Sequence, residues 1–496
     1  MGRCYFKRNV VALSLPRNTI MKSYLLLPGI TLAAVTTICC IKQNKPYTAV
    51  DKVPVEVNAG PQENYAAYCA GCHGEKMNAF VDRDWKHGNG LKDLVKGIKN
   101  GWPDDGMPAF AQTFSDKEIE ELAQYILTGI KERREYDFDD RPRSDVFKTE
   151  KLTVKLETVA TGIDVPWGMA FLPDGGMLVT DRGGKMYKVF NKQKQEIKGV
   201  PSVVAEGQGG LLDVAIHPDF VKNQLVYFSY SKPHRDNKRL ATTAVVRAKL
   251  GRGGLSEQKI IFEAFPYQST RHHYGSRLVF DGKGHLFISV GERGNERENP
   301  QATDNNQLGK IHRINEDGTI PADNPIMDGS GKVTSLYTYG NRNPQGLALH
   351  PVTSELWENE HGPRGGDEVN ILQPGKNYGW PLTSYGINYN GTTITDKTTA
   401  PGITDPQHYW IPSIGPSGLA FVTGDKYKPW KGALLSGSLR FQYLNLSYLD
   451  GIKITGEEKL LKNIGRVRDV RMAPDGFIYV AVEQPAAAIY KLVPIE

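Results

Sequence analysis

Two cysteines and a histidine stand together early in the chain. In Cys69-Ala70-Gly71-Cys72-His73, two thiols are three positions apart and an imidazole follows at once. Thiols at this spacing can add to the two vinyl groups of a haem, and the histidine is then held where it can ligate the iron. A zinc half-site and a redox CxxC are the alternatives, but no cysteine after Cys72 supplies a second pair of zinc ligands. The motif therefore predicts a covalently bound haem c.

A sixth iron ligand is expected downstream of this motif. Met107, in Gly106-Met107-Pro108, stands about as far along the chain as the thioether ligand of small class I cytochromes. Thioether ligation raises the reduction potential, which suits an electron acceptor. Met77 is too close in sequence to His73 to reach the opposite face of the ring. We therefore predict His73 and Met107 as the iron ligands, with ordinary packing as the alternative for Met107.

A second set of chemically capable residues lies in polar loops farther along the chain. Any one of them would be ordinary, because a lone histidine or arginine is more often structural. Together they predict a cationic basin around a histidine, which suits an anionic ligand rich in oxygen. The residues are Gln208, His272, His273, Arg342, Asn343, Gln345, Glu360, His361, Asp367, Glu368, Arg440, Arg466 and Arg468.

The elements that carry these loops form an internal repeat. Short β-rich runs separated by turns of the Pro-Asp-Gly kind recur over 166–180, 211–230, 276–290, 344–358, 416–436 and 467–482. Their mean spacing of about sixty residues leaves room for four strands and a functional loop in each copy. One copy is too small to bury its own faces, whereas a ring protects the sheet edges. The repeat predicts an all-β six-bladed β-propeller over residues 151–496, against two unrelated β-domains as the alternative.

The region before the repeats has a short helical pattern. Ser115 and Glu118 form a capping box, and apolar residues recur on one face of the helix that follows. Residues 58–135 therefore predict a small all-α cytochrome c domain. The stretch 136–150 is dense in both charges, contains Pro142 and lacks apolar periodicity, which predicts a linker.

Composition limits the classes of partner and the sources of stability. The chain has 496 residues, which predicts two or more folding units, and a mild net charge of +6. No basic run is interleaved with aromatic residues, so a nucleic-acid surface is not expected. All five cysteines lie at or before Cys72, so no disulfide framework is available to the repeats. Packing and metal binding must stabilise that part.

Residues 1–45 have the features of an export leader. Translation from Met21 would place an apolar run over 24–41 near the new N-terminus, which resembles a signal peptide. Cys39 and Cys40 at its end suit a lipoprotein, although the residues before Cys39 are not the small ones expected. The run is also near the lower length limit for a spanning helix. A periplasmic or exported protein is predicted, with a lipid anchor, an uncleaved anchor and a free protein as alternatives.

Three motifs give the second half of the chain a specific resemblance. They are His273-Tyr274-Gly275-Ser276-Arg277-Leu278, Gly340-Asn341-Arg342-Asn343-Pro344-Gln345-Gly346 and Arg466-Val467-Arg468-Asp469-Val470. From about Leu152 to its end, the chain resembles the soluble PQQ-dependent aldose sugar dehydrogenases of the glucose/sorbosone dehydrogenase family. The region before it resembles a fused class I cytochrome c. PQQ, haem c and Ca²⁺ are the cofactors that the resemblance implies.

The resemblance implies roles for the matching residues. His273 would be the general base, with Gln208 beside it and the substrate. Arg342 would polarise the reactive quinone carbonyl, and Asn343 and Gln345 would border cofactor and sugar. Arg440, Arg466 and Arg468 would bind the PQQ carboxylates. The main-chain carbonyls of Gly362 and Pro363 would hold the PQQ-bound calcium, and Asp367 and Glu368 would hold a structural calcium.

Two departures from the family pattern stand in the same loops. The glucose enzymes of the family have a lysine at the position of Arg440, so this side chain would pair with a carboxylate as a fork rather than as a point charge. They also have an acid at the position of His272. This second difference leaves the preferred sugar open.

The implied reaction is the oxidation of an aldose at C1 to its lactone. A hydride would pass to PQQ, and the electrons would pass through haem c to a downstream redox protein. One alternative is a calcium-dependent propeller lactonase, which would need a carboxylate-rich channel centre. The other is a non-enzymatic propeller that binds a partner beside an electron-transfer cytochrome, which leaves the histidine and arginines unexplained.

Overall fold

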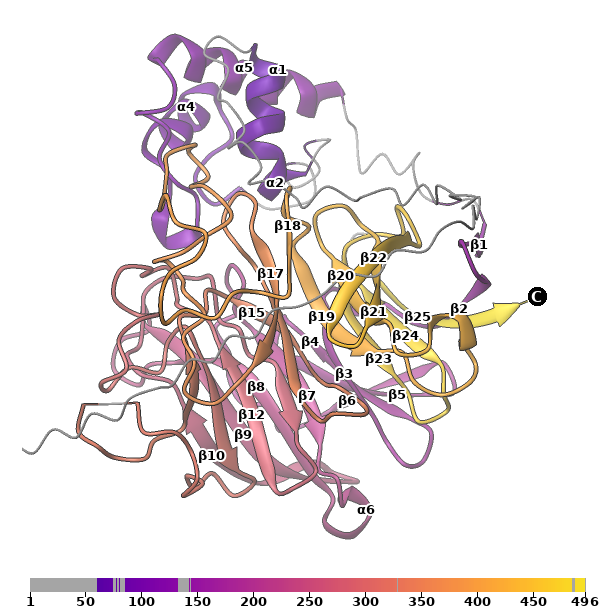
Figure 1. Ribbon diagram of the computed structural model, residues 1–496. Helices are drawn as coiled ribbons and strands as arrows, with labels where there is room; N and C mark the ends of the chain where they lie inside the picture. The colour runs from indigo at the N-terminus through magenta and orange to yellow at the C-terminus, as the bar shows by residue number, and fades with distance from the viewer. Residues whose placement is uncertain are drawn as a thin grey trace, which may run out of the picture. The chain divides into compact units, whose positions relative to one another are not determined.

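The computed structural model describes residues 60–74, 77, 80, 85–132, 142, 144–327, 329–483 and 487–495. The chain divides into two compact units, Met1–Val55 and Glu56–Glu496, and every contact given below lies within the second (Figure 1). The leader, with Met21, Cys39 and Cys40, and most of the linker lie outside the described residues and stay predictions. No helix in the described ranges is both long and apolar enough to cross a membrane.

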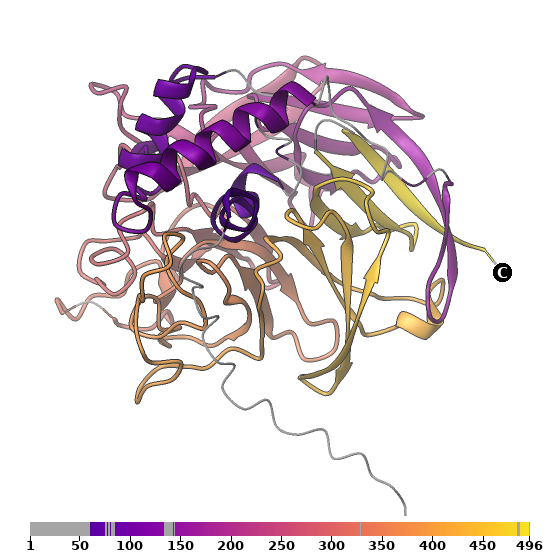
Figure 2. The same cartoon turned by 90° about the horizontal axis from the view of Figure 1, so that it is seen from above.

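The first part of the described chain is helical, as the sequence predicts. Its elements are α1 (Pro61–Asn64), the π-helical turn η1 (Tyr65–Cys69), α2 (Ala70–His73), α4 (Leu91–Asn100), the 3-10 turn η2 (Pro103–Asp105) and α5 (Asp116–Glu132), the long helix in Figure 2. The capping box is confirmed, since Glu118 N donates to Ser115 Oγ at 3.3 Å and Ser115 N donates to Glu118 Oε2 at 2.7 Å. Ile119 and Leu122 on the apolar face of α5 are fully buried.

The rest of the chain forms six antiparallel sheets, each the size of one propeller blade (Figure 1). Blade 1 contains β3 (Pro166–Phe171), β4 (Met177–Asp181), β5 (Lys185–Phe190) and β6 (Gln193–Ile197). Blade 2 contains β7 (Leu211–Ile216), β8 (Leu225–Pro233), β9 (Ala241–Gly251) and β10 (Gly254–Glu263), with α6 (Phe220–Asn223) between its first two strands. Blade 3 contains β11 (Leu278–Phe280), β12 (His285–Val290), β13 (Lys310–Asn315) and β14 (Leu336–Tyr339).

The second half of the ring follows the same order. Blade 4 contains β15 (Pro344–Leu349), β16 (Leu356–Glu360), β17 (Asp367–Leu372) and β18 (His408–Trp410). Blade 5 contains β19 (Pro416–Phe421), β20 (Leu434–Ser438), β21 (Leu444–Asp450) and β22 (Lys453–Leu460), with the turn η3 (Lys428–Trp430). Blade 6 joins β1 (Val146–Lys148), β2 (Thr153–Thr161), β25 (Ala488–Ile495), β24 (Ile478–Val482) and β23 (Val467–Met472). Each predicted repeat copy is the first strand pair of one blade.

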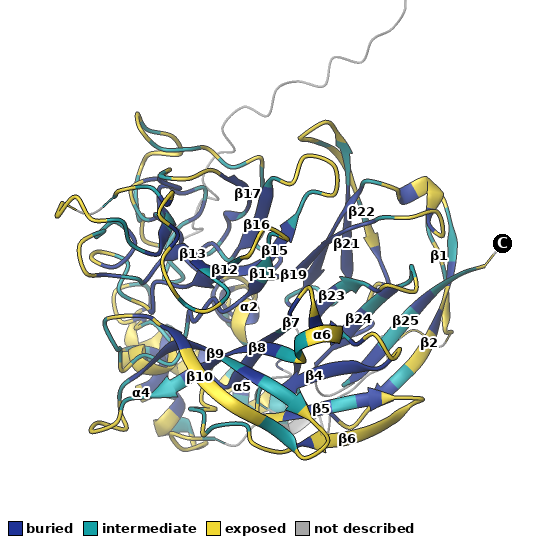
Figure 3. Cartoon of the chain, turned by 90° about the horizontal axis from the view of Figure 1, so that it is seen from below, coloured by how far each residue is buried: buried dark blue, intermediate teal, exposed yellow. Residues whose placement is uncertain are grey.

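Apolar packing between neighbouring blades closes the ring. A separate buried cluster lies at each of the six junctions, including the junction of blade 6 with blade 1, where Ala481 and Ile489 pack with Met169 and Val179. Inner strands are buried on both faces, while the outermost strands β6 and β10 are largely exposed (Figure 3). A sheet whose inner strands are buried on both faces must have another blade packed against each face. The six-bladed β-propeller is thus confirmed.

Blade 6 is built from both ends of the propeller sequence. Strand β2 pairs antiparallel with β25, and the register places Thr153 opposite Ile495. Strand β1 adds an outer strand to β2, with Val146 opposite Lys155. The propeller therefore begins at Val146, inside the stretch assigned to the linker, and not at residue 151.

Candidate active site

The predicted site residues meet at one end of the propeller because of the strand directions. Four of the predicted residues lie just before the first strand of a blade. They are Gln208 before blade 2, His273 before blade 3, Arg342 before blade 4 and Arg466 before blade 6. Gly362 follows the second strand of blade 4, which runs antiparallel to the first and so returns to the same edge. Arg440 follows the second strand of blade 5 in the same way. Residues far apart in sequence are therefore brought to one face.

His273 is held in one orientation by contacts on both its backbone and its ring. Its backbone N donates to Gln208 Oε1 at 2.8 Å, which brings together the predicted base and its predicted neighbour. Its Nδ1 forms a short hydrogen bond with Glu292 Oε1. The residue has φ of 54°, in the left-handed region that non-glycine residues seldom occupy. Such a backbone is stable only where surrounding contacts fix it, which is common at functional sites.

The electrostatics keep His273 neutral. Burial first, and then the positive charges of Arg342 and Arg293, lower the pKa of His273 well below its ordinary value. Burial raises the pKa of Glu292. An ionised Glu292 accepts a hydrogen bond from Nδ1–H of a neutral imidazole, which leaves Nε2 without a proton. The arrangement can therefore remove a proton from a substrate hydroxyl at neutral pH.

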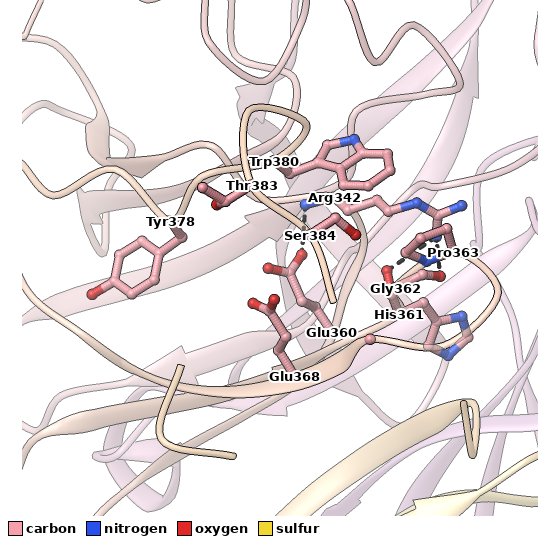
Figure 4. Close-up of a pocket in the computed structure, with 11 residues that line it drawn as sticks. Arg342, Glu360, His361, Gly362, Pro363, Glu368, Tyr378, Trp380, Thr383 and Ser384 are labelled. Carbon is pink, nitrogen blue, oxygen red and sulfur yellow. Dashed lines mark hydrogen bonds between the residues drawn. The ribbon is translucent and has the colours of Figure 1, made fainter. Parts of the chain in front are cut away.

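Arg342 is bonded to the loop between β16 and β17. Its guanidinium donates to Gly362 O at 2.6 Å and to His361 O at 3.0 Å, and it lies 5.1 Å from the ring centroid of Trp380 (Figure 4). Its Nε is buried without a hydrogen-bond partner. A buried donor without a partner is costly, so it is suited to an acceptor oxygen on a bound ligand. Asn343 Nδ2 is buried without a partner in the same way.

Three neighbouring carboxylates lie on β16 and β17: Glu358 and Glu360, which are buried, and Glu368, which is half-buried. Burial raises the pKa of Glu360 to about 7, although Arg342 N and Asn343 N donate to its carboxylate. Burial, and then the charge of Glu360, raise the pKa of Glu358 well above its ordinary value. Glu360 and Glu368 line one cavity together with Arg342, Gly362 and Pro363 (Figure 4). This acidic lining suits a cation beside the Gly362 loop.

The loop carbonyls and carboxylates differ in their capacity for calcium. Gly362 O and Pro363 O each accept one hydrogen bond, from Arg342 and from Ser413 Oγ at 3.0 Å, so each keeps a second lone pair. Asp367 instead accepts from Gly362 N and Gly415 N, both at 2.8 Å, so its carboxylate holds the loop backbone. In the described ranges, no three or more His, Cys, Asp or Glu side chains are grouped to hold a metal. Main-chain carbonyls fit calcium better here than side chains do.

A chain of side-chain contacts links the base to the predicted carboxylate-binding arginines. Asn343 Oδ1 accepts from Gly275 N and from Gln345 Nε2, both at 3.1 Å. Gln345 Oε1 in turn accepts from Arg468 at 3.4 Å. The structure thus brings Asn343, Gln345 and Arg468 into one group with His273.

Arg466 and Arg468 share an acidic partner that the sequence did not indicate. Arg466 Nε donates to Glu483 Oε2 at 2.9 Å, and Arg468 forms a short ion pair with Glu483 Oε1. Burial raises the pKa of Glu483, but Arg468 and Arg466 outweigh it and hold that pKa far below its ordinary value. Burial lowers the pKa of Arg468 to about 10. One carboxylate for two guanidinium groups leaves a net positive charge for an anionic ligand.

Arg440 lies at the same end of the propeller. Its backbone N donates to Ile414 O at 3.0 Å, and its guanidinium lies 4.8 Å from the ring centroid of Phe441. Arg466 NH1 donates to Leu439 O at 3.1 Å, which ties the two arginine-bearing loops together. The three predicted arginines are therefore neighbours.

The residues of the predicted haem site fit a covalently bound haem. Cys69 and Cys72 form no disulfide and stand on the turn that ends in His73, with Cys69 buried and Cys72 exposed. Met107 packs against the same apolar cluster as Cys69. Met77 is buried against α5, close to Gly129, as expected for a packing residue. Two thiols and an imidazole on one turn, with a thioether packed against the same core, match what a covalently bound haem requires.

Sequence reasoning missed Glu292, Glu483 and Tyr389 as site residues. Glu292 and Glu483 each follow the second strand of a blade almost at once, the position that also brings Gly362 to the site. Tyr389 lies in the loop between β17 and β18, and burial raises its pKa to about 12 against the opposing effect of the charge of Arg342. For Glu292 and Glu483, the sequence signal that could have identified them is an acidic residue just after a buried strand.

These features define a propeller oxidoreductase fused to a cytochrome. Residues 163–491 match the glucose/sorbosone dehydrogenase family, and residues 57–126 match the cbb3-type cytochrome c oxidase subunit III family. The chain belongs to the glucose/sorbosone dehydrogenase family and carries an N-terminal cytochrome c domain. The resemblance inferred from the sequence motifs is confirmed.

Relatives agree with this assignment. Over 350 residues the chain is 43% identical to the aldose sugar dehydrogenase YliI of Escherichia coli (strain K12), a match that covers 69% of this chain and 93% of that protein. The crystal structure of the soluble aldose sugar dehydrogenase from Escherichia coli in the apo-form has a TM-score of 0.65 at 41% identity, over 69% of this chain and 100% of the other. The PQQ-bound form of the Streptomyces coelicolor aldose sugar dehydrogenase has a TM-score of 0.58 at 28% identity, over 69% and 98%.

Proposed function

We propose that this protein oxidises aldose sugars at C1 to lactones, with PQQ as the primary acceptor and haem c as the secondary one. The observation that carries the proposal is the neutral His273, held by Glu292 and Gln208 beside the buried cation Arg342. A base next to a fixed positive charge suits removal of a hydroxyl proton while negative charge develops on a neighbouring oxygen. PQQ, when bound, supplies a carbonyl carbon that accepts hydride.

The residues around His273 supply binding and orientation. Asn343 and Gln345 offer amides at the edge of the site, and Arg342 Nε offers a free buried donor to an oxygen atom. Arg440, Arg466 and Arg468 would bind the PQQ carboxylates, and Gly362 O and Pro363 O would hold calcium. The base would take the proton of the anomeric hydroxyl at Nε2, because Nδ1 is occupied by Glu292.

Fusion to the cytochrome suits the electron count of the reaction. Sugar oxidation releases two electrons at once, whereas a haem iron accepts one at a time. A covalently attached haem would remove each electron in turn and pass it to an external redox protein. An export leader would place this electron route outside the cytoplasm.

The test is the visible spectrum of the haem in the purified protein loaded with PQQ and calcium. Addition of an aldose without any mediator is expected to produce the reduced c-type bands, and omission of either PQQ or sugar is expected to prevent them. His273→Ala should keep bound PQQ but lose sugar-dependent reduction by about 10²- to 10⁴-fold, the usual contribution of a general base. His234→Ala is the matched control, because it removes an imidazole that accepts hydrogen bonds from Asp236 N and Asn237 N and packs against Tyr267, all in blade 2 and its loops. Near-normal sugar oxidation by His273→Ala would contradict the assignment.

A further inference from the structure

Loops of the propeller that carry site residues contact the haem-attachment turn. Tyr68, the residue before the first haem cysteine, has its ring centroid 4.5 Å from the guanidinium of Arg364, two residues beyond Gly362. A Cβ at Gly391 would lie 3.2 Å from the same ring. Thr113 Oγ1 donates to Asn390 O at 2.8 Å. Three contacts therefore join the haem-binding core to the loop over 385–392 and its neighbour.

The loop that carries Met107 contacts the segment that carries the base. Arg271 N donates to Asp104 O at 2.9 Å. A Cβ at Gly106 would lie 3.3 Å from His272 Nδ1, so glycine permits the close approach of this loop. The ring centroids of His272 and His273 are 4.5 Å apart. Both haem-holding segments thus lie against catalytic loops.

The haem motif itself also approaches the propeller. A Cβ at Gly71, within the motif, would lie 3.9 Å from Arg440 Cζ. The haem motif therefore lies close to an arginine predicted to bind the PQQ carboxylates.

We infer that this contact is the internal electron-transfer interface, in which Arg364, Asn390 and Gly391 of the propeller contact Tyr68 and Thr113 of the haem-binding region, and Arg440 faces Gly71 of the haem motif. The inference rests on the proposed function and adds a route to it. Oxidation of one sugar releases two electrons and two protons. Each electron reduces one ferric haem to ferrous haem, an external one-electron oxidant such as ferricyanide reoxidises the haem between the two transfers, and both protons leave to solvent.

Gly391→Phe is the direct test, because a side chain there must displace Tyr68. Gly402→Phe is the matched control: the two glycines have φ of 84° and 82°, but nothing lies within 4 Å of a Cβ at Gly402. Both substitutions strain the backbone alike, so only the first acts on the contact. In the full-length protein loaded with haem, PQQ and calcium, we expect Gly391→Phe to slow haem reduction by an aldose about 10-fold or more, a loss equivalent to about 1.4 kcal/mol of docking. Sugar-dependent reduction of a small phenazine dye should change less than about 2-fold, since such surface changes are usually small.

A second readout needs no PQQ. In the haem-loaded, PQQ-free protein, amide hydrogen exchange at Arg271 reports the bond to Asp104, which is remote in sequence from Gly391. Gly391→Phe is expected to speed exchange at this amide, and Gly402→Phe is not. Equal exchange and equal haem reduction in the two variants would overturn the inference. So would a loss of dye reduction in Gly391→Phe as large as the loss of haem reduction, since the loop would then serve only the quinone site.

Thr113→Val tests the contact from the cytochrome side. It removes the hydrogen bond to Asn390 O, whereas the control Thr128→Val removes a bond to Gln124 O within α5. Slower haem reduction is expected only in Thr113→Val, and identical behaviour of the two variants would count against the interface. Failure of the proposed function would look different, because the unaltered protein would then reduce neither dye nor haem with sugar.

Discussion

Replacement of Glu292 by glutamine gives a sharp test of how the site works. Glu292→Gln keeps the volume of the side chain but removes the charge that faces His273 Nδ1. A hydrogen bond to a charged group contributes about 1.5–3 kcal/mol. If that bond is needed to orient the base in the transition state, kcat/KM should fall about 10- to 150-fold, at about 1.4 kcal/mol for each factor of ten. Dye-linked oxidation of an aldose measures this directly.

The pH profile separates loss of orientation from loss of the neutral base. If His273 is the proposed base, it acts when it is unprotonated, so kcat/KM is expected to fall as pH drops through its pKa. Burial, Arg342 and Arg293 keep that pKa below the ordinary value, so the acid limb should lie below pH about 6.5. Removal of the negative charge of Glu292 lowers the pKa of His273 further and moves the acid limb to lower pH. The loss near pH 7 must then come from the position and tautomer of the ring.

Glu298→Gln is the matched control for this experiment. Glu298 lies in the same loop, is exposed, and accepts a hydrogen bond from Asn295 Nδ2 at 2.8 Å. Its replacement should leave both kcat/KM and the acid limb unchanged. A change of less than about 2-fold in Glu292→Gln, or an acid limb displaced to higher pH, would refute the role given to Glu292.

Three further predictions concern charge, capping and metal. Glu483→Gln should lower stability at pH 7 by about 3–5 kcal/mol, because it leaves Arg468 buried without its counter-ion. Urea unfolding at several pH values measures how much less stable the variant is than the unaltered protein. Since the pKa of Glu483 is depressed, this difference in the free energy of unfolding should be complete above pH about 4.3 and should shrink below it. A difference that does not change with pH would contradict this. Ser115→Ala should destabilise α5 by about 1 kcal/mol, seen as a lower unfolding midpoint of the haem region, while Ser330→Ala in a surface loop should not. Removal of calcium by a chelator should release PQQ, measured by its absorbance after filtration, if Gly362 O holds the ion; full retention of PQQ would exclude this role.

The fold was predictable from the sequence because each blade repeats a local signal. The first two strands of each blade are apolar runs, joined in blades 1 and 6 by a short turn, and this pattern is visible without any knowledge of distant contacts. Strand β1 was assigned to the linker because three residues carry no periodicity. Its strand character depends on pairing with β2, and therefore on tertiary contacts.

Site residues that stand in a sequence motif could be predicted. Site residues that are recognised only by the side chains they contact could not. His273 and Arg468 stand in motifs, whereas Glu292 and Glu483 are defined only by the side chains they meet. Asp367 shows the opposite case: its carboxylate type suggested calcium, but both oxygens accept hydrogen bonds from loop backbone. The type of a residue alone does not show which of its acceptor oxygens already accept hydrogen bonds from the protein.

Closure of the ring through β2 and β25 has a consequence for biosynthesis. Because the pairing of Thr153 with Ile495 joins the two ends of the propeller sequence, blade 6 cannot form until β25 has been made. The cysteines predicted to receive haem are made long before that point. The helical region contains its own core, so it can fold and receive its haem first. Maturation would thus proceed from the electron acceptor to the sugar site, and a truncated chain would yield a haem protein with an open, inactive ring.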